Sequence, residues 1–142
     1  MKVMLIGKAT KETEAGKMPT NEAMVAMHEY TQELQKAGVL RDLAGLTPTS
    51  RGVRVRYSGG KHRVIDGPFA ETKEVIAGYF LIEVKTLAEA IDWAKRAPFG
   101  MGVRDGEEAE VEIRPLFSPE DFDVPGEAEE RAKRLGEKLG KA

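Results

Sequence analysis

Tyr57, His62 and Asp66 are residues of the types that move protons or hold a polar substrate, and they lie within ten positions of one another. Asp66 is the strongest candidate for a catalytic acid or base, because a carboxyl group on an apolar face has a shifted pKa that suits proton transfer. His62 is the second catalytic candidate, and Tyr57 is a candidate for substrate binding. The alternative for Asp66 is structural: its carboxylate can accept hydrogen bonds from the backbone of a turn at Gly67-Pro68.

A charged segment follows directly and contains Glu71, Lys73 and Glu74. An acid beside a lysine can bind or polarise a small polar substrate, so Glu71 and Lys73 are substrate-binding candidates. The same three residues can equally form surface ion pairs, which contribute little to stability. Both interpretations remain open from the sequence.

A β-hairpin is expected to position the first group of candidates. Ser58-Gly59-Gly60-Lys61 is typical of a two-residue hairpin loop between two alternating segments. Cross-strand partners in such a hairpin lie on the same face. One face is therefore expected to carry Val53, Val55, Tyr57, His62, Val64 and Asp66. The opposite face is expected to carry Arg54, Arg56, Arg63 and Ile65.

The three arginines of the second face form the only concentrated basic patch in the sequence. Arg56 and Arg63 are expected opposite each other, and such a like-charge pair favours an anionic partner. With Arg54, they are predicted to bind a ligand carboxylate or phosphate. Acidic residues of another strand or subunit, such as Glu110 and Glu112, are an alternative partner, and a solvated hairpin is a third interpretation. Nucleic acid is not expected, because the patch is small and has no aromatic residues on its own face.

The order of the expected elements predicts an α+β domain. It is strand, helix, strand, hairpin, strand, helix, strand, over residues 2–7, 21–37, 39–46, 53–66, 75–84, 87–97 and 110–114. Two helices on one face of an antiparallel sheet make a ferredoxin-like βαββαβ domain, here with an inserted hairpin. We assign this domain to residues 1–117 and a C-terminal helical extension to residues 118–142. The nearly all-apolar strand at 75–84 predicts that a second copy covers the other sheet face, giving a homodimer.

Apolar stripes predict which sides of the two helices are buried. The stripe of the first helix is Ala23, Met27, Tyr30, Leu34 and Ala37. The stripe of the second helix is Leu87, Ala90, Ile91, Ala94 and Ala97. Trp93 lies off this second stripe, which predicts a boundary position or a subunit contact.

Composition excludes several classes of site. The 142 residues include no cysteine and two histidines, which excludes disulfides, thiolate metal sites and cysteine nucleophiles. No metal and no cofactor are expected. No apolar run reaches the roughly 18 residues of a membrane span, and the N-terminus has no signal-peptide flank, so the expected location is cytoplasmic. The formal net charge of −2 gives no general attraction to nucleic acid.

The chain resembles the YCII-related family, in its DGPF-domain branch. The resemblance is carried by the segments DGPFAETKE at 66–74, GYFLIE at 78–83, EAIDWA at 89–94 and VEIRPL at 111–116. It implies a dimeric α+β barrel in which two ferredoxin-like sheets pack around a cavity. Some relatives look like muconolactone-isomerase-type or dechlorinating enzymes, and DGPF proteins are often discussed beside extracytoplasmic-function sigma factors.

One position departs from the pattern of the other YCII branch. There a histidine on the first helix, paired with an aspartate, is the proposed catalytic dyad. The matching position here is Met27, and His28 is rotated by about 100° from it. The dyad is therefore not carried over to this chain.

Two functions remain open at this point. The first is a small cofactor-independent enzyme of isomerase or lyase type, with Asp66 as acid or base and with arginine or Lys73 orienting a small organic or anionic substrate. The second is a ligand- or partner-binding module without chemistry, linked to transcriptional regulation.

Overall fold

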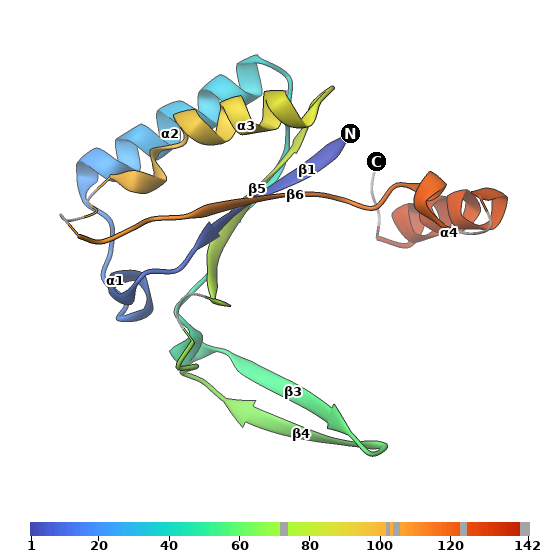
Figure 1. Cartoon of the computed structure of the whole chain (residues 1–142), viewed down its shortest axis with the longest axis horizontal. Coiled ribbons are helices and arrows are strands. Elements are labelled where there is room, and N and C mark those ends of the chain that lie inside the picture. Colours follow the sequence, from blue (N-terminus) through green and yellow to red (C-terminus); the bar gives the residue numbers. More distant parts are fainter. Residues whose placement is uncertain (72–73, 102, 104–105, 123–124, 140–142) are drawn as a thin grey trace.

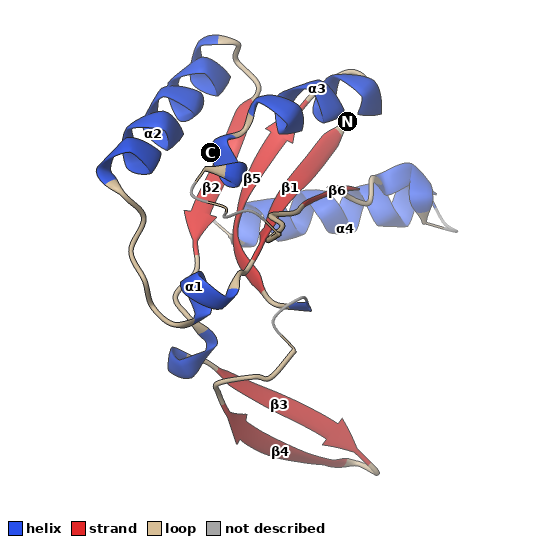
Figure 2. Ribbon diagram, turned by 60° about the vertical axis from the view of Figure 1, so that its left-hand side comes forward, coloured by secondary structure: helices blue, strands red, loops and turns tan. Residues whose placement is uncertain are grey.

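The main body of the protein is a four-stranded antiparallel sheet with two helices on one face (Figures 1 and 2). A computed structural model describes residues 1–71, 74–101, 103, 106–122 and 125–139, with the side chains of 125–129 outside the description. The strands are β1 (Lys2–Lys8), β2 (Leu40–Gly45), β5 (Ile76–Glu83) and β6 (Val111–Pro115), in the spatial order β2-β5-β1-β6. The helices are α2 (Asn21–Lys36) and α3 (Leu87–Arg96). This connectivity is the predicted ferredoxin-like βαββαβ arrangement.

The remaining elements are short or lie outside the sheet. They are α1 (Lys11–Glu14), the 3₁₀ turns η1 (Thr49–Arg51), η3 (Pro98–Gly100) and η4 (Pro119–Asp121), strands β3 (Val53–Ser58) and β4 (Lys61–Asp66), and α4 (Pro125–Lys138). Both views show α4 lying beyond the end of β6, away from α2 and α3. Its main contacts are with η4.

The core lies between the sheet and the two helices. Val3 and Leu5 of β1, Phe80 and Ile82 of β5, and Leu34 of α2 are buried there. Alternate residues of a strand point to the same side, so these positions define the helix-facing side of the sheet. Both helices start at a threonine cap that accepts a backbone N–H three residues on, from Ala23 for α2 and from Glu89 for α3.

Tyr30 joins the two helices through a hydrogen bond. Its hydroxyl donates to the carbonyl oxygen of Trp93 at 2.8 Å. In an unbroken helix the N–H of Ala97 would donate to the Trp93 carbonyl, but at the end of α3 it donates to the carbonyl oxygen of Ala94 instead. Burial raises the pKa of Tyr30 to about 12.

The buried side of α3 differs from the predicted stripe. Trp93 is buried, with its ring 6.4 Å from that of Tyr30, so the expected boundary position was wrong. Leu87 and Ile91, which were predicted to be buried, are exposed. The helix is rotated so that its one large aromatic ring fills the space above the sheet, where aromatic burial is worth more than that of a single aliphatic chain.

The face of the sheet opposite α2 and α3 is only half buried. Its centre is formed by Met4, Ile6, Tyr79 and Leu81. Charged groups border this open face: Lys8 pairs with Glu112 at 3.2 Å, and the hydroxyl of Tyr79 donates to Asp42 at 3.0 Å.

The predicted hairpin register is confirmed. Val53 pairs with Asp66, Arg56 with Arg63, and Tyr57 with His62. Gly59 and Gly60 have φ angles of +57° and +75°, as a two-residue turn with both central residues left-handed requires. The hairpin projects from the body (Figure 1), and only Ile65 among its twelve strand residues is not exposed.

We expect the burial of the Tyr30 phenol to make the folded protein lose stability at high pH. Below pH 10 the phenol is protonated in both states, so its contribution is complete. Between pH 10 and about 12 the unfolded chain releases the proton while the folded chain retains it, which removes roughly 1.4 kcal/mol per pH unit. The measurement is the urea-unfolding free energy of the wild type minus that of Tyr30→Phe.

This difference should be about 1 kcal/mol near neutral pH and should decrease above about pH 10. Lysine titration affects both proteins alike, so the subtraction removes it. A difference that stays constant across this range would contradict the assignment.

Candidate functional site

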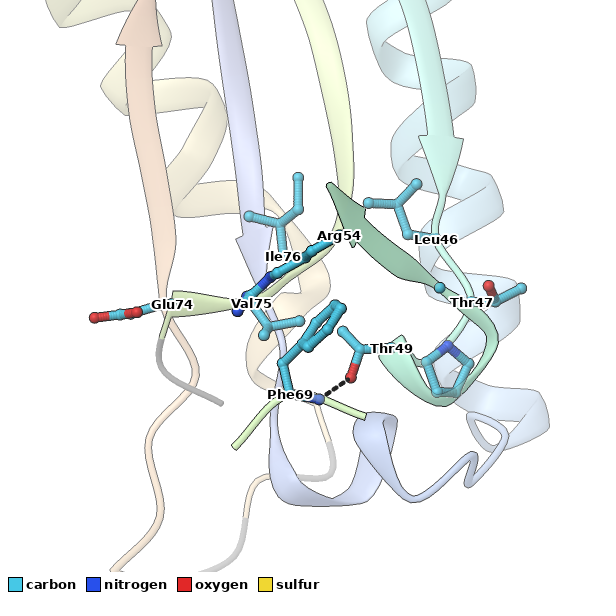
Figure 3. Close-up of a pocket in the computed structure, with 10 residues that line it drawn as sticks. Leu46, Thr47, Thr49, Arg54, Phe69, Glu74, Val75 and Ile76 are labelled. Atoms are coloured by element: carbon cyan, nitrogen blue, oxygen red, sulfur yellow. Dashed lines mark hydrogen bonds between the residues drawn. The ribbon is translucent and has the colours of Figure 1, made fainter. Parts of the chain in front are cut away.

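A cavity of about 350 Å³ lies where the hairpin leaves the body of the protein. We call it the root cavity (Figure 3). It is lined by Leu46, Thr47, Pro48, Thr49, Gly52, Arg54, Phe69, Glu74, Val75 and Ile76. These residues come from the segment between β2 and β3, from β3 itself (Arg54), from the chain after β4 and from the start of β5. The hairpin therefore brings together residues distant in sequence.

Arg54 and Phe69 form the polar and aromatic part of the cavity wall. The guanidinium carbon of Arg54 lies 3.7 Å from the centroid of the Phe69 ring, a cation–π contact. Leu46, Val75 and Ile76 surround the pair in the close-up, whereas the carboxylate of Glu74 points away from them (Figure 3). A fixed cation beside an aromatic ring and aliphatic side chains suits an organic anion with an apolar body.

The loop that carries Phe69 is held by a chain of hydrogen bonds. The Phe69 N–H donates to the hydroxyl oxygen of Thr49 at 3.1 Å. That hydroxyl donates to one carboxylate oxygen of Glu14, and the Thr49 N–H donates to the other at 3.0 Å. Glu14 belongs to α1, so this short helix fixes η1 and, through it, the floor of the cavity.

Gly67 permits the closest backbone approach at this junction. Its N–H donates to the carbonyl oxygen of Gly52 at 2.9 Å. A Cβ atom at this position would lie 1.7 Å from the carbonyl oxygen of Thr49, so any larger residue forces the two segments apart. The peptide bond between Gly67 and Pro68 is cis. These constraints, rather than a side-chain turn at Asp66, shape the junction.

The sequence-predicted site residues are distributed along the hairpin. Arg54 is the one that lines the root cavity. Tyr57 and His62 lie next to the tip, with ring centroids 6.4 Å apart. Asp66 is exposed at the other end of β4, and its carboxylate has no hydrogen bond within the part of the chain that the structure describes.

His62 and Asp66 lie near opposite ends of the same strand, β4. The two share a face, as predicted, but they are four positions apart on β4, which corresponds to about 13 Å. Within one chain they therefore do not contact each other. Arg56 and Arg63 are cross-strand partners and lie nearer the hairpin tip than Arg54. Both side chains are exposed.

The charged segment after the hairpin is only partly described. Glu71 is exposed, and its carbonyl oxygen accepts the N–H of Glu74 at 2.9 Å. Lys73 lies outside the described residues.

Several cavity residues were not predicted as site residues. Leu46, Thr47 and Thr49 precede the hairpin, and Val75 and Ile76 begin a strand, so each looks structural in the sequence. The one available signal was Phe69, whose position after Gly67-Pro68 indicated a turn that delivers an aromatic ring to the interior.

The described residues contain no group of three or more His, Asp or Glu side chains placed to hold a metal ion. They also contain no helix whose length and apolar character would let it cross a membrane.

Comparison with known proteins identifies relatives. The model of a family described as the YCII-related domain matches residues 1–117. The chain is also 40% identical over 81 residues to an uncharacterised protein of Rhizobium meliloti (strain 1021). That alignment covers 57% of this chain and 62% of the relative, so the chain spans less than two thirds of the relative's length.

Proposed function

We propose that this chain, which belongs to the YCII-related family, binds a small organic anion in the root cavity. The resemblance to that family implies small organic substrates. The observation that carries the proposal is Arg54, whose guanidinium lies on the Phe69 ring at the cavity wall. Its charge has no ion pair among the described residues. A ligand carboxylate would supply the missing anion, and the aliphatic wall would cover the ligand's apolar part.

The cavity favours binding over proton transfer. Among the described residues, the ionisable ones that line it are Arg54 and Glu74, and Glu74 points away from the aliphatic wall (Figure 3). An arginine stays protonated throughout the physiological range, so it orients an anion rather than exchanging a proton with it. The Thr47 hydroxyl adds a hydrogen-bonding group that does not titrate there, whereas the Thr49 hydroxyl already donates to Glu14.

The proposal also includes a homodimer formed through the open face of the sheet. Met4, Ile6 and Leu81 lie there side by side on neighbouring strands, half exposed to solvent. Apolar side chains grouped on one sheet face are stabilised when a second surface excludes water from them. A second copy offers the same apolar centre, and the charged borders formed by Lys8 and Glu112 can then pair around it.

We expect the chain to sediment at about twice its monomer mass of 15.6 kDa. Leu81→Glu places a charge at the centre of the open face and should convert the protein to a monomer, because an unpaired buried carboxylate is strongly unfavourable. The matched control is Val25→Glu, at an exposed apolar position on α2. Sedimentation velocity measures both variants. A monomeric wild type, or equal dissociation by the two variants, would count against this interface.

The ligand proposal predicts a selective loss in Arg54→Met, which keeps the apolar stem and removes the charge. Benzoate binding, followed by amide chemical shifts in NMR, should weaken by roughly 10-fold or more, the value of one charge-assisted hydrogen bond. Arg56→Met is the control, because Arg56 lies on the same hairpin face but does not line the cavity. Benzamide, the neutral analogue, should bind the wild type no better than it binds Arg54→Met.

The proposal is refuted if benzoate and benzamide bind the wild type equally. It is also refuted if shift changes on benzoate addition avoid Leu46, Phe69 and Ile76, since these residues line the root cavity.

A second candidate function is acid–base catalysis with Asp66 and His62. The observation that favours it is the confirmed hairpin register, which places both residues on the same face as Val53, Val55 and Val64. A partner surface that covered this face would enclose the carboxyl group of Asp66 among valine side chains and exclude bulk water from it. Glu71 and Lys73 remain the substrate-binding candidates of this scheme.

This alternative makes a distinct prediction for the assembled protein. Asp66→Asn should abolish any isomerisation of muconolactone by the assembled protein, followed by ultraviolet absorbance, because an amide cannot donate or accept the transferred proton. Asp92→Asn, at an exposed position on α3, is the matched control. Equal activity of the two variants, or no activity in the wild type, rules out the acid–base role.

A further inference from the structure

The two faces of the hairpin carry different side chains. Its apolar face is formed by Val53, Val55, Tyr57 and Val64, together with His62 and Asp66. Its basic face is formed by Arg54, Arg56, Lys61 and Arg63, together with Ser58 and Ile65. The strands pair without a register shift, so alternation along each strand keeps the four cations on one side. Asp66, the only acidic residue of the two strands, lies on the other side.

Arg56 and Arg63 are a pair of like charges without a counter-ion in this chain. They stand directly opposite each other, where cross-strand Cβ atoms are about 5 Å apart and like charges repel. Both side chains are exposed, and neither forms a salt bridge with any residue that the structure describes. An anionic group between the two guanidiniums would replace this repulsion with charge-assisted hydrogen bonds.

The register also fixes how far this pair lies from the root cavity. Arg54, which lines the cavity, precedes Arg56 by two positions on β3 and lies on the same face. Two positions along a strand correspond to about 7 Å. Ile65, the cross-strand partner of Arg54, is the one strand residue of the hairpin that is not exposed. The basic face therefore presents one cation at the cavity, an aliphatic side chain beside it and a pair of cations about 7 Å farther along the strands.

We infer that the ligand of the root cavity is an organic dianion whose two anionic groups stand at opposite ends of a short apolar body. This inference rests on the proposed function, in which Arg54 holds the first anionic group at the cavity wall. The apolar body lies between the aliphatic wall of the cavity and Ile65. Arg56 and Arg63 bind the second anionic group, because the planar guanidinium matches the geometry of a carboxylate.

Three small molecules test the inference in the wild-type protein. Terephthalate carries carboxylates at opposite ends of a benzene ring, and 4-carbamoylbenzoate has the same shape with a neutral amide at one end. Phthalate has the charge of terephthalate, but its carboxylates are adjacent and cannot reach both positions. At low ionic strength, terephthalate should bind roughly 10-fold more tightly than either of the others, the value of one charge-assisted contact. Isothermal titration calorimetry measures the three affinities. Phthalate binding as tightly as terephthalate would contradict the spacing.

NMR locates the second anionic group. Terephthalate should shift the amide signals of Arg56 and Arg63 as well as those of the cavity residues Leu46 and Phe69. Benzoate, which lacks the second group, should shift the cavity signals alone. Shifts confined to the cavity with both molecules would overturn the inference.

A pair of hairpin variants separates the specific contact from a general effect of charge. Arg63→Met should lower the ratio of the terephthalate affinity to the 4-carbamoylbenzoate affinity about 5-fold. Lys61→Met removes an equal charge from the same face, two positions nearer the tip, and should leave this ratio unchanged. An equal loss in the two variants would show that only the overall charge matters, and the inference would fail.

The outcomes also distinguish this inference from the proposed function. If benzoate does not bind at the root cavity, the proposed function fails and the inference fails with it. If benzoate binds there but terephthalate binds no better than 4-carbamoylbenzoate, the dianion alone is overturned. If Arg63→Met instead weakens the homodimer in sedimentation velocity, and terephthalate has no advantage, an acidic surface of a second copy occupies the arginine pair and the inference is wrong.

Discussion

The sheet of this protein has two faces, and the described helices α2 and α3 cover only one of them. This asymmetry is the constraint on which the rest of the molecule depends. On the covered side, Tyr30 holds the helices together by donating to Trp93, and the core needs no further partner. On the open side, Met4 and Leu81 stay half exposed although they sit on the two central strands. Covering this apolar face stabilises the central strands, and the proposed homodimer would supply that cover.

The second organising feature is the junction at which the hairpin leaves the body. Gly67 passes so close to Thr49 that no side chain fits, and Glu14 fixes Thr49 from below. The hairpin direction and the cavity walls are therefore set by the same few contacts. Arg54 belongs to both, since it is a residue of β3 and also lines the cavity. A shift of register in the hairpin would move its guanidinium to the opposite face.

The sequence predicted features that rest on local rules and missed those that rest on distant contacts. The hairpin register followed from Gly59-Gly60, because a two-residue loop leaves one pairing. The burial of Trp93 did not follow from its helix, because the space that it fills is defined by Tyr30, 63 residues earlier. The root cavity was missed for the same reason: its walls come from three separated segments. The shared face of His62 and Asp66 was predicted, but their separation depends on a strand rise of about 3.4 Å per residue.

Helix α2 has no histidine at the position that carries the proposed catalytic histidine in the other YCII branch. In the other YCII branch a histidine on this helix, paired with an aspartate, is the proposed catalytic dyad, whereas Met27 occupies the matching position here and packs against the core. His28, one residue on, is exposed, because a rotation of about 100° carries it off the buried side. An apolar thioether neither accepts nor releases a proton, so α2 supplies no base at that position. The other candidate groups lie on the hairpin and at the root cavity. Arg54 supplies a permanent cation at the root cavity, and Asp66 lies on the apolar face of the hairpin. The distinction between a binding protein and an enzyme therefore rests on whether the face of the hairpin that carries Asp66 is covered or open to water.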